Sequence, residues 1–335
     1  MPITILTGFL GSGKTTVLNH LTQQPSFERI LILINEFGEI GIDSDLVTNV
    51  SDDSVIEMSS GCLCCTIRSD ITDTLSMALQ KFSKNGIPFF KKVIIETTGL
   101  ADPAPIIHTL MSDPIISTQF DLWGVIATVD AVNGNETIDR QIEAVKQIAM
   151  ADTILVTKTD LVDQHSLEKL KKRLEIFNPA ADQIIVKNGI ADFQSLLNQG
   201  FYNLKSKSLE AQNWLRAEAY NKDQHHAHTH DDINRHDAEI KAFCLKIDEP
   251  ILNGALDIWL RALQMFRGDD LLRLKGIINI AGKSEPMIIH GAQHILHPSI
   301  FLQKWPSEDR RSRIVFITRN IDPSELFASI QNLTN

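Results

Sequence analysis

The sequence predicts an α/β fold in which a parallel sheet carries helices on both faces, followed by a smaller α+β domain. Across the first 200 residues, short apolar runs alternate with stretches of helical period, a pattern typical of strand–helix–strand units. A chain of 335 residues is long enough for two domains. The predicted strands are 3–6, 30–34, 54–57, 92–96, 123–129, 153–157 and 183–187.

Apolar side chains repeat at steps of three or four between these strands, and they mark the buried faces of helices. The three clearest stripes are 67–82, 138–149 and 167–174.

The alternating pattern stops near residue 205, where polar residues and histidines take over. We therefore divide the chain into a first domain at 1–205, a mobile His-rich linker at 206–238 and a C-terminal α+β domain at 239–335. Strands are expected in the last domain at 241–247, 271–281, 287–290 and 312–318, with a helix over 252–266 and a final helix that Asp322-Pro323 opens.

Composition and charge exclude several classes of function. Acidic residues outnumber basic ones by 42 to 32 and no Lys/Arg block occurs, so nucleic acid is not expected as a partner. The N-terminus lacks the charged and apolar regions of a secretory signal, and no apolar run approaches the length of a membrane span. We expect a cytoplasmic protein without a membrane partner.

A phosphate-binding loop follows the first predicted strand and opens a helix. Residues 8–15 have the P-loop spacing, which is a glycine, any four residues and then Gly-Lys-Thr. Its glycines let backbone N–H groups approach phosphates, Lys14 is predicted to neutralise the β- and γ-phosphates, and the Thr15 hydroxyl is predicted to bind Mg²⁺. The first domain is therefore predicted to be a P-loop NTPase domain, with nucleotide contacts from Gly8, Gly11, Ser12, Gly13, Lys14, Thr15 and Thr16.

A second nucleotide motif is an apolar strand that ends in an acid, with a glycine three residues later. Glu96 stands where the acid of such a sheet reaches Mg²⁺, and the Gly99 N–H can meet the γ-phosphate. Lys14, Glu96 and Gly99 are therefore the catalytic candidates. Because no glutamine follows Gly99 at a water-orienting position, slow intrinsic hydrolysis is expected.

The third motif, Thr157-Lys158-Thr159-Asp160, follows a predicted strand and resembles the guanine-recognition motif of GTPases. Asp160 can accept hydrogen bonds from guanine N1–H and the 2-amino group, which adenine does not offer, and Lys158 would lie along the ring plane. Thr157 replaces the commoner Asn, so one amide that tethers the loop is lost. The three motifs together favour GTP over ATP.

Three cysteines, Cys62, Cys64 and Cys65, crowd into four positions and stand too close together for a disulfide framework. They precede a predicted helix, where thiolates are favoured. Soft thiolates suit Zn²⁺, Co²⁺ or Cu⁺. The alternative for any single one of the three is a small buried hydrophobe, because adjacent side chains point in different directions; for the cluster as a whole this alternative is much weaker.

Together, residues 8–16, 35–43, 61–65, 96–103 and 157–160 resemble the CobW-like GTPase metallochaperone family. That family is related to the nickel-insertion GTPases for urease and hydrogenase, and it includes zinc-transferring, cobalt-associated and nitrile hydratase activator branches. Leu274-Lys-Gly276 and residues 289–294 resemble the family's C-terminal domain. The resemblance covers most of the chain.

The resemblance implies slow GTP hydrolysis, stimulated by metal or client, in which Mg²⁺·GTP orders a switch segment against the Cys loop. Glu36, Glu39 and Asp43 fall in that switch segment, with Glu36 at or beside the metal. It also implies transfer of the metal, with Zn²⁺ favoured and Co²⁺ possible, to an unidentified client apoprotein.

The histidines of the linker are candidate accessory metal ligands, because neutral imidazole binds Zn²⁺, Co²⁺ and Ni²⁺. Their spacing suits loose capture at several sites, and a solvated loop is the alternative. The candidates are His225, His226, His228 and His230. By contrast, His290, His294 and His297 are expected to be structural or surface residues.

Three other functions remain open at the level of sequence. One is a P-loop kinase or ATPase with structural cysteines, another is a non-catalytic metal store or sensor with a vestigial nucleotide site, and the third is an insertase directed to cobalt or iron.

Overall fold

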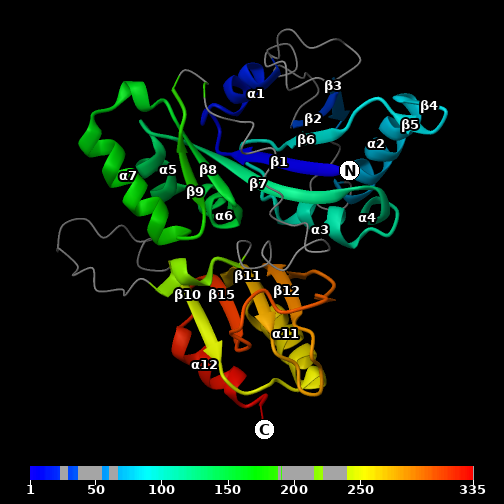
Figure 1. Cartoon of the computed structure of the whole chain (residues 1–335). Coiled ribbons are helices and arrows are strands. Elements are labelled where there is room, and N and C mark those ends of the chain that lie inside the picture. The colour runs from blue at the N-terminus through cyan, green and yellow to red at the C-terminus, as the bar shows by residue number, and fades with distance from the viewer. Residues whose placement is uncertain are drawn as a thin grey trace. The chain divides into compact units, whose positions relative to one another are not determined.

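The computed structural model describes residues 1–22, 29–36, 55–59, 67–187, 190, 215–221 and 240–334. The chain divides into two compact units, Met1–Lys171 with Ala181–Tyr202 and Lys172–Ala180 with Asn203–Asn335 (Figure 1). The predicted boundary at 205 lies outside the described residues, so the division into 1–205, 206–238 and 239–335 stays a prediction.

A seven-stranded parallel sheet forms the centre of the N-terminal unit, in the order β3-β2-β6-β1-β7-β8-β9. Every predicted strand of this region is present, with ends within two residues of the expected ones. The strands are β1 (Pro2–Gly8), β2 (Ile30–Glu36), β3 (Val55–Ser59), β6 (Lys92–Glu96), β7 (Asp121–Asp130), β8 (Thr153–Thr157) and β9 (Asp182–Ile185).

The chain changes direction across the sheet at β1. Strands β2, β3 and β6 lie on one side of β1, and the chain then crosses to β7 on the other side. In open parallel sheets, ligands bind at the carboxyl ends of the strands beside such a switch point. The register puts Leu6 of β1 opposite Glu96 of β6, and Gly8 of β1 opposite Thr128 of β7. The fold therefore gathers the ends of these three strands at one edge.

Helices cover both faces of this sheet, as predicted (Figure 1). Helix α1 (Lys14–Thr22) buries Val17, Leu18 and Leu21 against side chains of six strands on one face. On the other face, α6 (Ile142–Met150) contacts β1 and β7, and α3 (Ala104–Ser112) contacts β7. The remaining helices are α2 (Ile67–Lys81), α4 (Ile116–Gln119), α5 (Gly134–Arg140), the 3-10 helix η3 (Thr159–Leu161) and α7 (Gln164–Phe177).

The predicted stripe 138–149 faces the core, because Ile138, Val145 and Ala149 are buried, but it lies on two helices rather than one. Gln141 is extended, with φ −125° and ψ 106°, and it ends α5 and begins α6. The apolar period continues across the break because both helices face the same core, so periodicity alone did not reveal it.

A short hairpin, β4 (Ser83–Lys84) and β5 (Ile87–Pro88), was also not predicted. Its turn is Asn85-Gly86, with φ 54° and 78°. An Asn-Gly pair is a strong hairpin signal, so the sequence does carry this information.

The C-terminal unit is an antiparallel sheet in the order β10-β15-β11-β12-β13, with β14 paired to β12. The four predicted strands are present, and β13 and β14 are additional short ones. The strands are β10 (Ile240–Ile247), β11 (Leu271–Ile278), β12 (Met287–Ala292), β13 (Ile295–Leu296), β14 (Ile300–Phe301) and β15 (Ser312–Arg319).

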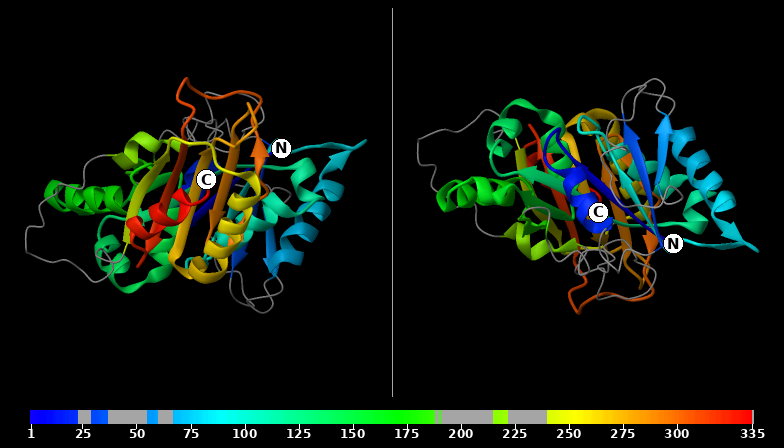
Figure 2. Two further views of the ribbon diagram at one scale, coloured as in Figure 1. Left: turned by 90° about the horizontal axis from the view of Figure 1, so that it is seen from below. Right: turned by 90° about the horizontal axis from the view of Figure 1, so that it is seen from above.

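Two helices, α11 (Asn253–Arg267) and α12 (Pro323–Gln331), lie on the same face of this sheet (Figure 2). Asp322 accepts a hydrogen bond from the Ser324 N–H at 2.8 Å, which caps α12 where Asp322-Pro323 was predicted to open a helix. Under the helices, the Phe316 ring stacks on Phe243 at 5.3 Å and meets Trp259 edge-on at 6.5 Å. The short 3-10 helix η5 (Gly268–Asp270) follows α11.

Part of the range predicted as linker packs against the C-terminal sheet. Leu215 and Ala217 are buried, and η4 (Ala217–Asn221) contacts β10 and β15. Two apolar residues in a polar stretch carry no periodic signal, so the sequence did not distinguish this segment from the rest of the linker.

Among the helices that the structure describes, none is long and apolar enough to cross a membrane.

We expect Phe316→Ala to lower the free energy of unfolding of the C-terminal unit by about 3–5 kcal/mol, because the substitution leaves a cavity beside the rings of Phe243 and Trp259. Thermal and urea unfolding of the full chain would measure it. Phe301→Ala is the control, since Phe301 is 47% exposed and its loss should change stability by less than about 1 kcal/mol. Equal losses for both variants would contradict this account of the core.

Candidate functional site

The phosphate loop leaves β1 through three glycines with positive φ: Gly8 (142°), Gly11 (71°) and Gly13 (93°). A side chain at Gly8 is excluded twice, because that φ is disfavoured for other residues and a Cβ there would lie 2.6 Å from the Thr128 carbonyl oxygen. The loop therefore approaches β7 more closely than a residue with a side chain could. These backbone angles turn the segment directly into the first turn of α1.

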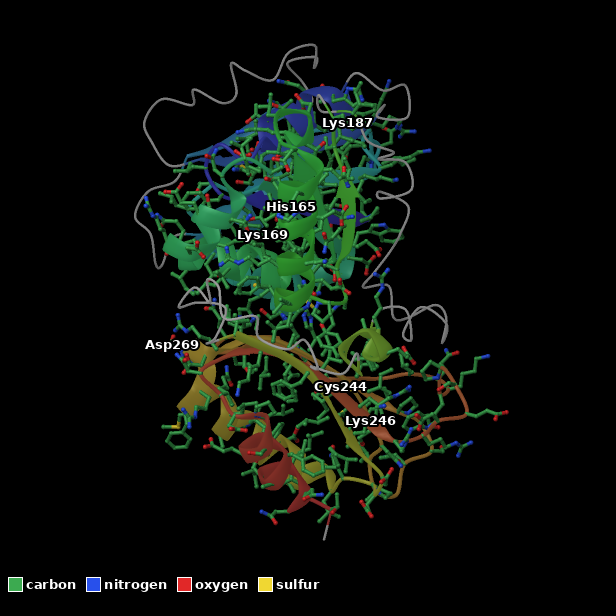
Figure 3. The ribbon with its side chains drawn as sticks, turned by 90° about the vertical axis from the view of Figure 1, so that its left-hand side faces the viewer. His165, Lys169, Lys187, Cys244, Lys246 and Asp269 are labelled. Atoms are coloured by element: carbon green, nitrogen blue, oxygen red, sulfur yellow. The ribbon has the colours of Figure 1, made fainter. Side chains whose placement is uncertain are left out.

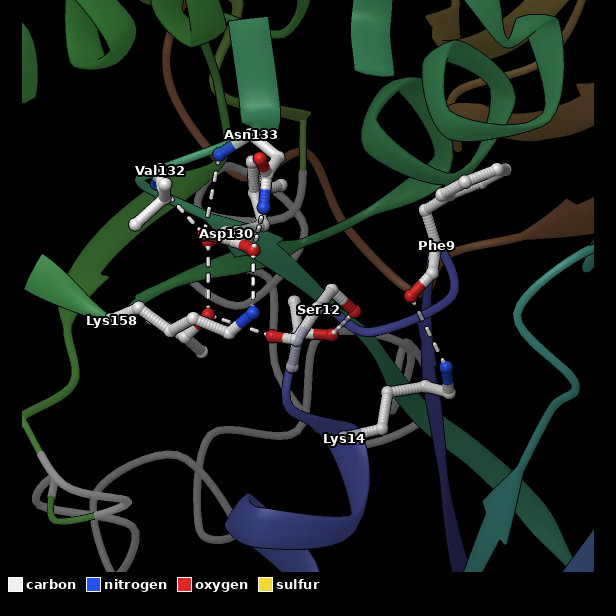
Figure 4. Close-up of polar contacts among 10 residues, drawn as sticks. Phe9, Ser12, Lys14, Asp130, Val132, Asn133 and Lys158 are labelled. Carbon is white, nitrogen blue, oxygen red and sulfur yellow. Dashed lines mark hydrogen bonds and ion pairs between the residues drawn. The ribbon is translucent and has the colours of Figure 1, made fainter. Parts of the chain in front are cut away.

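Lys14 is buried at the start of α1, and its ammonium group points back into the loop. Its Nζ donates to the Gly8 carbonyl at 2.9 Å and to the Phe9 carbonyl at 3.4 Å (Figure 4). The charge thus lies where a phosphate cradled by the loop would contact it. Thr15 is half-buried, and Thr16 is exposed.

Hydroxyl groups tie the loop to β7 and β8. Ser12 Oγ lies 2.6 Å from Thr128 Oγ1, and Thr157 Oγ1 donates to the Ser12 carbonyl at 2.7 Å. Thr157 therefore supplies a tether although it lacks the amide of the commoner Asn. The amide is absent, as the sequence shows, but the Thr157 hydroxyl reaches the loop in its place. Thr128 was not among the predicted site residues, since a threonine within a buried strand carries no functional signal.

Glu96 is 2% exposed at the carboxyl end of β6, next to β1. The following residue, Thr97, donates from its N–H to the Leu6 carbonyl at 2.9 Å and from its hydroxyl to Thr7 Oγ1 at 2.8 Å. Gly99 lies so close to the loop that a Cβ would be 2.6 Å from the Leu10 nitrogen. The predicted acid and glycine are thus brought to the phosphate loop, as their motif requires.

Lys158 has a left-handed backbone, with φ 55° and ψ 31°, and it begins the turn of η3 that carries Asp160. Its Nζ lies 2.6 Å from Asp130 Oδ2 (Figure 4). Asp160 is exposed, which leaves its carboxylate accessible to a base. The predicted guanine motif and the phosphate loop therefore lie at the same edge of one sheet.

Asp130, at the end of β7, is a site residue that the sequence analysis missed. It accepts hydrogen bonds from the Val132 N–H at 2.7 Å and from Asn133 Nδ2 at 2.9 Å, in addition to Lys158. Burial raises the pKa of this carboxyl, but the hydrogen bonds from Lys158, Asn133 and Val132 outweigh burial and hold the pKa below its usual value. Asp130 therefore carries a negative charge that orients Lys158. The signal that could have identified Asp130 is an acid at the end of β7, the strand before the one that leads into the guanine motif.

Most of the predicted metal ligands lie outside the described residues: Cys62, Cys64, Cys65, Glu39, Asp43, His225, His226, His228 and His230. Glu36 ends β2, and its backbone is paired with Ser59 at the end of β3. The next described residue is Ile67, the first of α2. Within the described ranges, no group of three or more His, Cys, Asp or Glu is arranged to hold a metal ion.

The fourth cysteine, Cys244, differs from the other three in position and in chemistry. It lies half-buried on β10, on the same side of the strand as Lys246 (Figure 3). Burial raises the pKa of the Cys244 thiol to about 11, so the thiolate that binds metals is scarce there. Cys244 is therefore a suitable control for the cysteine cluster.

The C-terminal histidines have the environments expected of structural and surface residues. His290 and His297 are buried with ring centroids 4.6 Å apart, and burial, His297 and the cations Lys275 and Arg273 hold the pKa of His290 well below its usual value. His294 is exposed, and its Nε2 lies 2.9 Å from Asp269 Oδ1.

We expect Thr157→Val to lower GDP affinity by about tenfold, because the substitution keeps the shape but removes the donor to the Ser12 carbonyl. Thr157→Ser keeps the hydroxyl and should bind GDP within about twofold of the parent. Titration calorimetry with GDP would measure both. If Val binds as well as Ser, the hydroxyl does not hold the loop.

Two families match the chain, one for each unit. Residues 2–185 match the family described as "CobW/HypB/UreG, nucleotide-binding domain". Residues 240–334 match the "Cobalamin synthesis protein cobW C-terminal domain".

Relatives align over nearly the whole chain. The zinc chaperone YjiA of Escherichia coli (strain K12) is 31% identical over 99% of this chain and 98% of its own length, and the zinc chaperone CobW of a Sinorhizobium species is 28% identical over 99% and 97%. The crystal structure of Zn(II)-bound YjiA GTPase from E. coli superimposes over 100% of this chain and 99% of that one, with 28% identity and a TM-score of 0.69. The chain therefore belongs to the CobW/HypB/UreG family, with a nucleotide-binding domain and a cobW C-terminal domain.

Proposed function

We propose that this protein is a GTPase metallochaperone that passes Zn²⁺ to a client apoprotein under control of the bound nucleotide. One observation carries the proposal: the phosphate loop follows β1 and the cysteine segment follows β3, so both begin at the carboxyl ends of parallel strands of one sheet. The segment leaves β3 at Ser59, which is paired with Glu36, and the chain resumes at Ile67 in α2. The zinc chaperone names of the relatives support Zn²⁺ as the cargo.

The nucleotide would bind through contacts along this edge. The backbone of residues 8–16 would cradle the phosphates, and Lys14 would exchange its carbonyl partners for phosphate oxygens. Guanine would lie at the other end, with Asp160 accepting from N1–H and the 2-amino group, and with Lys158 held along the ring by Asp130. Thr157 would keep the loop and the base motif at a fixed separation.

The Thr15 hydroxyl and the Glu96 carboxylate are the oxygen ligands that would hold Mg²⁺. Their chemistry fits, because Mg²⁺ prefers hard oxygen donors and Glu96 is a buried carboxylate at the strand end beside the loop. When bound, Mg²⁺ would neutralise charge on the β- and γ-phosphates. Gly99 would present its N–H to the γ-phosphate, and its lack of a side chain permits that approach.

Metal cargo would be held by thiolates of Cys62, Cys64 and Cys65 together with Glu36. Thiolate and carboxylate ligands suit tetrahedral Zn²⁺, and Co²⁺ is the alternative cargo. Glu39, Asp43 and the histidines at 225–230 would be accessory ligands. Thiolates bind metal only while the cysteines stay reduced, so this role suits a reducing compartment and supports a cytoplasmic location.

Nucleotide control requires the metal affinity to differ between the GTP and GDP states. Glu36 ends the strand beside β6, so a change at Glu96 and Gly99 would occur one strand away from a candidate metal ligand. A switch segment that orders around γ-phosphate and Mg²⁺ is a known way to move such ligands.

We expect Asp160→Asn to weaken GTP binding by at least about a hundredfold, because the amide cannot accept both guanine hydrogen bonds. ATP binding should change by less than about threefold, since adenine lacks that donor pair. Asp163→Asn is the matched control, because Asp163 caps α7 through Ser166 and Asn also caps well. Competition titrations with GTP and ATP would measure the affinities of the parent protein and of both variants. An unchanged preference for GTP in Asp160→Asn would favour the kinase or ATPase alternative.

We expect Zn²⁺ affinity to differ by at least about fivefold between complexes with GDP and with a non-hydrolysable GTP analogue. Chelator competition with Zn²⁺, Co²⁺, Ni²⁺ and Cu⁺ would measure it and would rank the metals. Cys64→Ala and Cys65→Ala should each abolish the difference, whereas Cys244→Ala should leave it unchanged. Equal affinity in both nucleotide states would refute nucleotide control, and absence of GTP turnover with every metal would favour a metal store or sensor.

A further inference from the structure

Gln147 of α6 is a buried polar residue that is not among the predicted nucleotide or metal contacts. It is 1% exposed, and its side-chain Nε2 donates to the Ala101 carbonyl at 3.0 Å and to the Gly99 carbonyl at 3.3 Å. Both acceptors belong to the segment that follows Glu96. One side chain therefore holds the backbone on both sides of Leu100.

The neighbouring residue, Lys146, anchors the same segment by a second contact. Its Nζ lies 3.0 Å from Asp102 Oδ2, and both side chains are 23% exposed. The other oxygen of Asp102 accepts from the Ala104 N–H at 2.9 Å, at the first residue of α3. Residues 99–104 are thus held by α6 at one end and lead directly into α3 at the other.

Helix α6 provides a firm base for these contacts. Val145, Ile148 and Ala149 are at most 2% exposed, and α6 packs on β1 and β7. On its other side, the segment contacts the phosphate loop so closely that there is no room for a side chain between Gly99 and Leu10. A cavity of about 100 Å³ is lined by Leu10 and Gly11 of the loop and by Gln147 and Ile148 of α6. The segment is therefore clamped between the loop and α6.

We propose that Gln147 is a positioning residue for the GTPase reaction, which holds the Gly99–Ala101 backbone so that the Gly99 N–H faces the γ-phosphate. An amide suits this role because its two N–H groups donate to two carbonyls at once. GDP has no γ-phosphate, so it does not use this contact. The clamp therefore favours GTP over GDP without touching either nucleotide.

Packing contacts connect residues 99–104, through α3 and α2, with the start of the helix that follows the cysteine segment. Helix α3 packs against α2, and Thr72 Oγ1 of α2 donates to Asp113 Oδ2 at the end of α3 with a length of 3.1 Å. Helix α2 begins at Ile67, two residues after Cys65. A shift of residues 99–104 would reach the cysteines through two packed helices. This step rests on the proposed function, whereas the positioning role of Gln147 rests only on GTP binding.

The test compares Gln147→Leu, which keeps the volume and removes both donors, with Gln183→Leu. Gln183 is a matched control, because it also donates to a backbone carbonyl, that of Lys171 at 2.9 Å, but lies on β9 away from the loop. For Gln147→Leu, we expect the affinity for a GTP analogue to fall about tenfold while GDP affinity stays within about twofold. The value of kcat should fall, and Gln183→Leu should change neither affinity.

A purely structural role would lower stability and would weaken GDP and the GTP analogue equally, and that outcome would overturn the proposal. If Gln147→Leu does not fold, Lys146→Met tests the same anchorage at a partly exposed position. It should reduce GTP-analogue affinity about threefold and leave GDP affinity unchanged; an equal loss for both nucleotides would again overturn the proposal. Failure of the proposed function would give a different result. The Zn²⁺ affinity of the parent protein would then be the same with GDP and with the GTP analogue, whereas Gln147→Leu would still lower only the affinity for the GTP analogue.

Discussion

The phosphate loop packs against the end of β7 so closely that residue 8 has to be glycine, and the nucleotide site is built around that contact. The approach brings Ser12 within hydrogen-bonding distance of Thr128, and it places the Ser12 carbonyl where Thr157 of β8 can donate to it. Three strands thus share one loop. Burying the Lys14 ammonium inside this loop would be costly without partners, and the Gly8 and Phe9 carbonyls provide them. A loop ordered in this way presents its donors and its charge before a phosphate binds, so little conformational entropy is lost on binding.

Asp130 holds the base-recognition end of the site in place by hydrogen bonds, as the hydroxyl groups do for the phosphate loop. A buried carboxylate is stable only when its oxygens are satisfied, and here two backbone N–H groups, one amide and one ammonium group share it. The lowered pKa of Asp130 means that the charge persists well below neutral pH, so Lys158 keeps its partner under ordinary conditions. Because Lys158 also has a strained left-handed backbone, the turn that carries Asp160 is fixed at its first residue. The base motif is therefore rigid where it joins the sheet and exposed at Asp160.

The sequence predicted the parallel sheet almost completely, because its strands are buried on both faces and read as uninterrupted apolar runs. It predicts the phosphate loop, Glu96, Gly99 and the guanine motif as nucleotide contacts from their spacing, and the structure brings these segments to one edge of the sheet. It did not predict Asp130, Thr128 or Gln147, since each acts on another part of the protein rather than on the nucleotide, and such partners come from distant positions in the chain. The break at Gln141 escaped because two helices share one buried face. Local patterns thus reveal groups that touch the ligand and hide groups that position them.

Two routes connect the γ-phosphate end of the site with the cysteine segment, and they differ in what they can transmit. Along the sheet, Glu36 is reached from Glu96 through the backbone pairing of β2 with β6, which is continuous and resists displacement. Through the helices, residues 99–104 join the phosphate loop to α3, and α3 meets α2 through side-chain contacts that include the hydrogen bond from Thr72 to Asp113. A signal that moves ligands needs an element that can take up two positions. Asp102 is bound to Lys146 on α6 and to the first residue of α3 at once, so any displacement of residues 99–104 has to alter one of those contacts.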